Sequence, residues 1–132
     1  WAGLDPAQMG LGPVYAMAPI MQRHGFDSAD VDYYEINEAF AAQVLACLAA
    51  WQDADFCRTE LKRDTPFTAI DTERLNVDGG AVAVGHPVGA SGARIVLHLL
   101  NVLQQKNARR GMASLCIGGG QGGAMLIERP ME

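Results

Sequence analysis

Three short motifs carry the side chains that could do chemistry in this sequence. They are N-E-A-F at 37–40, G-H-P at 85–87 and C-I-G-G-G-Q-G at 116–122. Asn37 supplies an amide, His86 an imidazole that exchanges protons near neutral pH, and Cys116 a thiol. Each motif lies at a predicted turn beside an apolar segment, where the backbone can direct side chains and N–H groups at one ligand. The pattern therefore indicates acid–base chemistry.

The same residues also have simpler structural interpretations. Cys116 could be a small buried hydrophobic residue, since a reactive thiol needs an electropositive neighbour. His86 could be an incidental loop histidine, and Asn37 could serve as the N-cap of the helix that follows it. Packing and helix ends suffice to explain the remaining histidines and cysteines. These are His24, His98, Cys47 and Cys57.

Two glycine-rich segments have only a weak likeness to nucleotide-binding motifs. The run at 118–123 fits G-x-G-x-x-G, but neither a helix nor an acidic residue about twenty positions further on follows it. The segment G-H-P-V-G-A-S-G lacks the lysine of a P-loop. Nucleotide binding is therefore not supported.

The first half of the sequence predicts two helices and a strand. Apolar residues recur on one helical face over 13–24, after a proline suited to a first turn. A segment rich in β-branched, tyrosine and apolar residues over 31–36 predicts a strand that runs into Asn37. An apolar stripe over 40–54, with intervening alanines, predicts a largely buried helix.

The second half predicts a surface segment, a helix and a hairpin. The polar composition of 55–73 favours a surface excursion with at most one short helix. A second helical stripe begins near residue 90 and ends before 111, so His86 lies in a loop that leads into a helix. Strands over 112–117 and 124–128 are close enough to pair antiparallel. We expect a three-layer α/β/α domain whose mixed sheet ends in this hairpin.

Composition favours one compact domain without nucleic-acid or membrane partners. The chain has 132 residues, 49% of them hydrophobic, and a formal net charge of −5. No long basic run, signal peptide or membrane-spanning segment is visible, which favours a cytoplasmic protein, or an organelle-matrix protein in a eukaryote. Three cysteines without a C-x-x-C pair predict neither a disulfide framework nor a metal site.

Taken in order, the three motifs resemble the C-terminal half of a thiolase, the family that makes or cleaves the carbon–carbon bond of 3-ketoacyl-CoA. M-G-L-G-P near the start, N-V-D-G-G before G-H-P and G-A-S-G-A-R after it extend the resemblance to most of the chain. The resemblance implies a thiolase C-terminal domain over 1–132, with its first strand truncated. Asp78 departs from the family, which often has asparagine there, and the segment before N-V-D-G-G is longer than in many thiolases.

The resemblance also implies roles for the site residues. His86 would accept the proton of a nucleophilic cysteine from the N-terminal half, and Cys116 would exchange a proton with the substrate α-carbon or the CoA thiol. His86 and a water held by Asn37 would stabilise an enolate oxygen. The N–H of Gly118 would contribute to a second oxyanion hole.

Substrates and partners follow from the same resemblance. Coenzyme A and acyl-CoA are expected as substrates, with no permanently bound cofactor and no metal. The expected partners are an N-terminal thiolase domain and further copies of the chain in a homo-oligomer. The catalytic half should be inactive alone, because the cysteine that carries the acyl group lies in the other half. The alternative is a non-catalytic, thiolase-like interaction subunit.

Overall fold

The structure of the chain, a computed structural model, describes residues 1–130. Its strands are β1 (Ala2–Gly3), β2 (Tyr33–Ile36), β3 (Arg110–Ile117) and β4 (Gln121–Glu128). Its α-helices are α1 (Gly12–His24), α2 (Ala41–Gln52), α3 (Ala54–Thr59), α4 (Ala81–Val84) and α5 (Ser91–Gln105). Short 3-10 turns are η1 (Pro6–Leu11), η2 (Ser28–Asp30) and η3 (Thr72–Arg74).

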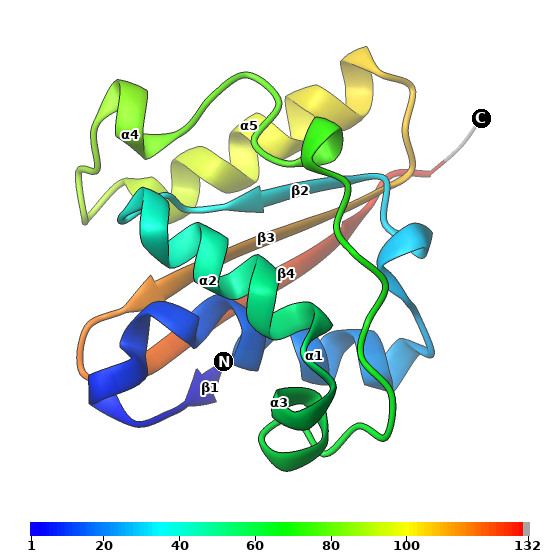
Figure 1. Cartoon of the computed structure of the whole chain (residues 1–132). Coiled ribbons are helices and arrows are strands. Elements are labelled where there is room, and N and C mark those ends of the chain that lie inside the picture. The colour runs from blue at the N-terminus through cyan, green and yellow to red at the C-terminus, as the bar shows by residue number, and fades with distance from the viewer. Residues whose placement is uncertain (131–132) are drawn as a thin grey trace.

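The four strands form one mixed sheet in the order β1-β4-β3-β2 (Figure 1). β3 pairs antiparallel with β4, which confirms the predicted hairpin, and β2 runs parallel to β3. β4 begins three residues earlier than the sequence pattern predicts, because Gln121, Gly122 and Gly123 already pair with β3. The two parallel strands therefore bring their carboxyl ends to the same edge.

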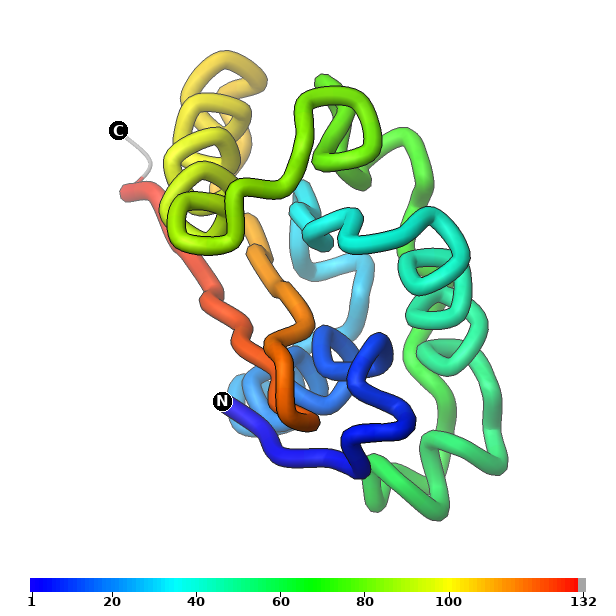
Figure 2. Tube along the Cα trace, turned by 90° about the vertical axis from the view of Figure 1, so that its left-hand side faces the viewer, coloured from blue at the N-terminus to red at the C-terminus, as the bar shows by residue number. Residues whose placement is uncertain are grey.

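Helices cover both faces of the sheet, as the predicted three-layer α/β/α arrangement requires (Figures 1 and 2). β3 alternates between the two faces because successive strand residues point in opposite directions. Met112 enters the larger core cluster with α1 and α2, whereas Ala113 packs against α5 in a smaller cluster. The sheet is thus the central layer of the domain.

The start of α1 crosses the sheet at unusually close range. A Cβ atom built on Gly122 in β4 would lie 2.0 Å from the Gly12 carbonyl oxygen. A Cβ atom on Gly12 would lie 3.2 Å from the Cα atom of Cys116. Glycine is needed on both sides of this crossing, which fixes α1 beside the carboxyl end of β3.

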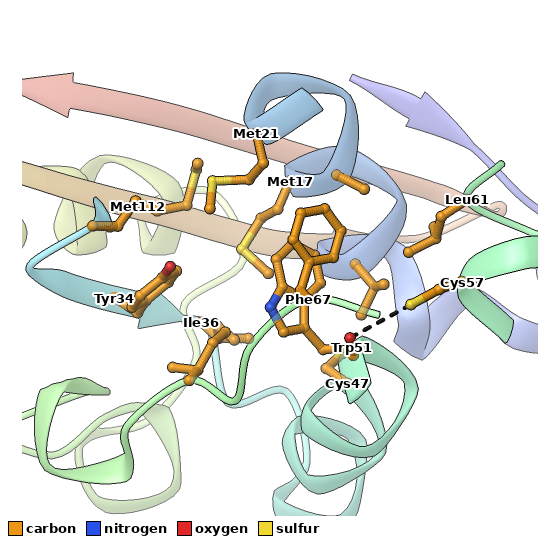
Figure 3. Packing of buried hydrophobic residues seen from close by; sticks show 14 of the residues in the cluster. Met17, Met21, Tyr34, Ile36, Cys47, Trp51, Cys57, Leu61, Phe67 and Met112 are labelled. Atoms are coloured by element: carbon orange, nitrogen blue, oxygen red, sulfur yellow. Dashed lines mark hydrogen bonds between the residues drawn. The ribbon is translucent and has the colours of Figure 1, made fainter. Parts of the chain in front are cut away.

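The segment over 55–73 lies mostly at the surface and holds one short α-helix, α3, as predicted, but four of its side chains also enter the core, which its polar composition did not indicate. Figure 3 shows Cys57, Leu61 and Phe67 inside the main core. The Phe67 ring stacks on Trp51 with 3.9 Å between centroids, and the Trp51 indole N–H donates to the Ser28 hydroxyl at 2.7 Å. The segment is a strap, residues 55–73, that anchors apolar side chains at irregular intervals under an otherwise polar exterior.

α2 is only half buried, so the expectation of a largely buried helix is wrong. Val44, Cys47 and Trp51 face the core, while Phe40 and Leu45 remain 71% and 66% exposed. Its alanines lie mainly on the exposed side or its border. One face of α2 therefore carries the packing, and the other presents apolar side chains outward.

Across residues 1–130, no helix is both long enough and apolar enough to cross a membrane.

Candidate active site

The segments that carry the three predicted site residues meet at one edge of the sheet. This is the edge toward which β2 and β3 run. Asn37 follows β2 directly, and its N–H donates to the carbonyl of Ser114 in β3 at 2.9 Å. Cys116 lies two residues further along β3. The α4–α5 loop that carries His86 passes the same end of the sheet (Figure 1). Ligands of open α/β sheets bind outside the carboxyl ends of strands, so this edge is the candidate site.

Asn37 is buried and its side-chain amide has no partner. Its exposed fraction is 2%, and neither the amide nitrogen nor the amide oxygen makes a hydrogen bond. The helix N-cap interpretation is wrong, because α2 begins at Ala41 with Phe40 as N-cap. An unpaired buried amide costs about 1–3 kcal/mol, so this one is a strong candidate to bind a polar group.

Asn37 also lines a cavity of about 150 Å³ between β2, the 76–80 turn, α4 and α5. Glu35, Glu38, Arg94 and His98 share its wall. The cavity therefore combines Asn37 with ionisable groups of both signs.

His86 is exposed, but its ring is tethered. Nδ1 lies 2.6 Å from the hydroxyl of Ser91, which is fully buried at the first position of α5. The Ser91 hydroxyl in turn donates to the Pro87 carbonyl at 3.2 Å. Arg94 donates to the Gly85 carbonyl at 2.8 Å and ties the start of the loop to the same helix. The loop thus holds His86 in one orientation.

Ser91 is a functional candidate that the sequence analysis missed. It belongs to the G-A-S-G segment five residues after His86, where a serine opens a helical stripe. A serine at this spacing, where the loop that carries His86 leads into a helix, is the signal that could have identified it.

Cys116 is buried in the penultimate position of β3, and burial raises the pKa of its thiol. The protonated thiol is therefore favoured. Directly after β3, Gly118 is exposed at the start of a turn in which Gly119 and Gly120 have φ angles of 85° and 77°. This glycine turn leaves backbone N–H groups near the strand end free of Cβ obstruction.

The segments that carry the three site residues meet at one edge of the sheet, but their side chains do not bond one another. Over the described part of the chain, no side-chain hydrogen bond links Asn37, His86 and Cys116. Cys47 and Cys57 are buried and unreactive by setting, as expected, with pKa values raised by burial. Among residues 1–130, no group of three or more histidines, cysteines or carboxylates is arranged to hold a metal ion.

Packing does not explain His98, contrary to expectation. Its side chain is 31% exposed, and its two ring nitrogens contact the carboxylates of Glu35 and Asp78. His24 does lie at a helix end, where it stacks on Phe26.

The mixed sheet with helices on both faces places this chain among α/β proteins. Residues 1–129 match the family model described as thiolase, C-terminal domain. The chain belongs to the thiolase family, which confirms the resemblance seen in its motifs.

Similar proteins are named acetyl-CoA acetyltransferase or 3-ketoacyl-CoA thiolase. The chain is 46% identical over 129 residues to a probable acetyl-CoA acetyltransferase of Escherichia coli, covering 96% of this chain and 28% of that protein. It is 43% identical to a 3-ketoacyl-CoA thiolase of Vibrio vulnificus, covering 98% of this chain and 30% of that protein. The chain thus spans less than a third of the length of these relatives.

A solved structure confirms the fold. The acetyl-CoA acetyltransferase of Syntrophomonas wolfei superimposes with a TM-score of 0.81 at 38% identity. The match covers 98% of this chain and 30% of that one.

Proposed function

We propose that this chain is the C-terminal catalytic half of a thiolase that transfers acyl groups between coenzyme A thioesters with cleavage or formation of a carbon–carbon bond. The observation that carries the proposal is the gathering of Asn37, His86 and Cys116 at one sheet edge in a chain of this family. Coenzyme A and acyl-CoA are the proposed substrates. The acyl group would be carried by a nucleophilic cysteine from an N-terminal thiolase domain.

His86 would be the base that takes the proton of this nucleophile. The Ser91 hydroxyl has one hydrogen, which the Pro87 carbonyl can accept. With that hydrogen on Pro87, Ser91 accepts from Nδ1–H of His86, and this tautomer leaves Nε2 with a lone pair. A neutral imidazole in this tautomer presents an acceptor on the exposed side of the loop, as a general base requires.

Cys116 would move the second proton. When the carbon–carbon bond of a 3-ketoacyl-CoA breaks, the electron pair stays on the acetyl-CoA α-carbon, and the Cys116 thiol protonates that carbon. The resulting thiolate then accepts the proton of the incoming CoA thiol, which attacks the acyl-cysteine and restores the free nucleophile. Burial keeps Cys116 protonated at rest and so favours the first of these steps.

Two sets of donors would stabilise the negatively charged oxygens. A water bound to the unpaired Asn37 amide, together with His86, would bind the enolate oxygen. The N–H of Gly118 would bind the oxyanion formed on the acyl-cysteine, in the glycine turn that permits close approach.

A thiolysis assay with acetoacetyl-CoA tests this function. The 132-residue chain alone should show no turnover, because Cys47 and Cys57 are buried and offer no accessible nucleophile. The same chain fused to the N-terminal half of a thiolase should turn over. Activity of the chain alone, with contaminating enzyme excluded, would refute the division of the site between two halves.

The second candidate is a non-catalytic interaction subunit, favoured by the missing contacts between the three site side chains. It predicts a folded fusion without thiolysis. Both candidates include association with an N-terminal thiolase domain and with further copies of the chain.

A further inference from the structure

Glu35, His98 and Asp78 form a charged cluster outside the proposed catalytic residues. His98 lies on α5, and its Nδ1 is 2.6 Å from Oε1 of Glu35 on β2. Its Nε2 is 3.0 Å from Oδ2 of Asp78 in the 76–80 turn. Glu35 is 5% exposed, whereas Asp78 is 63% exposed. The ring therefore links three segments that are distant in the sequence.

These contacts need an extra proton. A neutral imidazole has one N–H donor, and its second nitrogen carries a lone pair that repels a carboxylate oxygen. Only the imidazolium donates to Glu35 and Asp78 at once. When Glu35 and His98 together lose that proton, one of the two contacts becomes unfavourable.

The electrostatics of the surrounding groups agree with this geometry. Burial alone would lower the pKa of His98, but hydrogen bonds and charges from Glu35 and Asp78 outweigh it and raise that pKa. Burial raises the pKa of Glu35, aided by the charges of Glu38 and Asp78 and opposed by His98. Arg94 is the other charged group on the wall of the same cavity, and its guanidinium is bonded to the Gly85 carbonyl.

The segment held by Asp78 leads directly to the catalytic loop. Asn76 starts the 76–80 turn with φ of 47°. Its side-chain oxygen accepts from the Ile36 N–H at 3.0 Å, and its side-chain nitrogen donates to the Ile36 carbonyl at 2.9 Å. Gly79 has φ of 86°, and Gly80 precedes α4 and then His86. Asn76 secures one end of the turn to β2 regardless of pH, so only the Asp78 side depends on His98.

We propose that Glu35, His98 and Asp78 form a proton-dependent brace, which holds the Asp78 side of the 76–80 turn against β2 and α5 and releases that side as the pH rises. The brace closes one wall of the cavity that Asn37 lines. It goes beyond the proposed function, and its test needs no catalytic activity. Since the folded state favours the protonated ring, the stabilisation is complete below the ordinary pKa of histidine and is lost as the pH rises through the raised value.

The test is an NMR titration of the full 132-residue chain that follows the His98 ring and the amide exchange of Gly79 and Gly80. In the unsubstituted chain, exchange corrected for its intrinsic pH dependence should rise in step with deprotonation of His98. Asp78→Asn keeps an acceptor but removes a charge, so it should lower the His98 midpoint by about half a pH unit or more. Asp64→Asn, at an exposed residue outside the cluster, should leave the midpoint unchanged.

His98→Gln provides a second variant, since it can never be charged. Its corrected exchange at Gly79 and Gly80 should be fast and independent of pH. The brace is refuted if the Asp78→Asn midpoint equals that of the unsubstituted chain. It is equally refuted if amide exchange at Gly79 and Gly80 does not change as His98 titrates.

Discussion

His86 and Asn37 are held in opposite ways. His86 is exposed, yet a buried serine fixes its ring through Nδ1. Asn37 is buried by its surroundings, yet nothing bonds its amide. The imidazole is thus oriented without a ligand, whereas the amide is positioned by packing, and in the proposed site it would gain its hydrogen bonds from the bound molecule.

Ser91→Ala should lower kcat for thiolysis by about fivefold in the fusion with an N-terminal thiolase half. One hydrogen bond contributes about 1 kcal/mol, and 1.36 kcal/mol corresponds to a factor of ten in rate. KM for the CoA substrate should change little, because Ser91 is buried and its hydroxyl bonds to His86 and Pro87 of the loop. Steady-state kinetics measure both constants, and an unchanged kcat would remove Ser91 from its positioning role.

For single residues, the sequence predicted where a side chain lies along the strands and helices better than it predicted which residues that side chain contacts. Asn37 at a strand-to-helix junction and Cys116 at a strand end follow from local patterns, and the structure has them there. The partners of His98 lie 63 and 20 residues away in the chain, so no local pattern could indicate them. For the same reason, helical periodicity assigned His98 to packing.

At the scale of elements, the sequence predicted the helices and strands whose apolar residues recur regularly. It did not predict which residues are buried where that spacing is irregular. The stripes over 13–24 and from residue 90 became α1 and α5, and the paired strands became β3 and β4. The strap over 55–73 buries Cys57, Leu61, Phe67 and Ile70 at spacings that fit neither a helix nor a strand. These side chains are buried because they meet the Trp51 ring and the rest of the core. That contact exists only in the tertiary fold.

Phe67→Ala should lower the free energy of unfolding by about 3–5 kcal/mol, the range for deleting a buried aromatic ring. The lost ring is 2% exposed and stacks on Trp51. Phe40→Ala is the matched control, because that ring is 71% exposed and its loss should cost less than about 0.5 kcal/mol. Urea unfolding followed by tryptophan fluorescence measures both, and equal losses would contradict the strap as a core element.

Gly122→Ala should destabilise the chain severely. The new Cβ atom would meet the Gly12 carbonyl oxygen at 2.0 Å, and both atoms belong to backbone that is held by α1 and the hairpin. Gly3→Ala is the control, since a Cβ atom there meets nothing within 4 Å. Thermal melting compares the two; a Gly122→Ala chain as stable as Gly3→Ala would show that the crossing is looser than described.

At the scale of the whole molecule, α5 is apolar on more than the face it buries. Ile95 and Leu99 pack on the sheet, while Leu97 and Leu100 are 62% and 43% exposed. A groove of about 260 Å³ beside α5 is lined mainly by apolar residues and includes Trp1. Exposed leucines on α5 beside this apolar groove fit the proposed packing against an N-terminal thiolase domain.

The chain by itself should therefore self-associate. Sedimentation velocity at several concentrations should show an average mass that rises with concentration, and Leu97→Lys should weaken the association by placing a charge on the exposed face. A concentration-independent monomer that binds no hydrophobic dye would instead favour the free-standing interaction subunit.

The most direct test of the proposed catalytic half is the kcat for acetoacetyl-CoA thiolysis of the fusion carrying Cys116→Ala or His86→Ala, with Cys57→Ala as the matched cysteine control. We predict that each of the first two substitutions lowers kcat by at least about a hundredfold, as loss of general acid–base catalysis does, and that Cys57→Ala does not. Equal and small effects for Cys116→Ala and Cys57→Ala would make Cys116 a buried structural residue and contradict the proposed site.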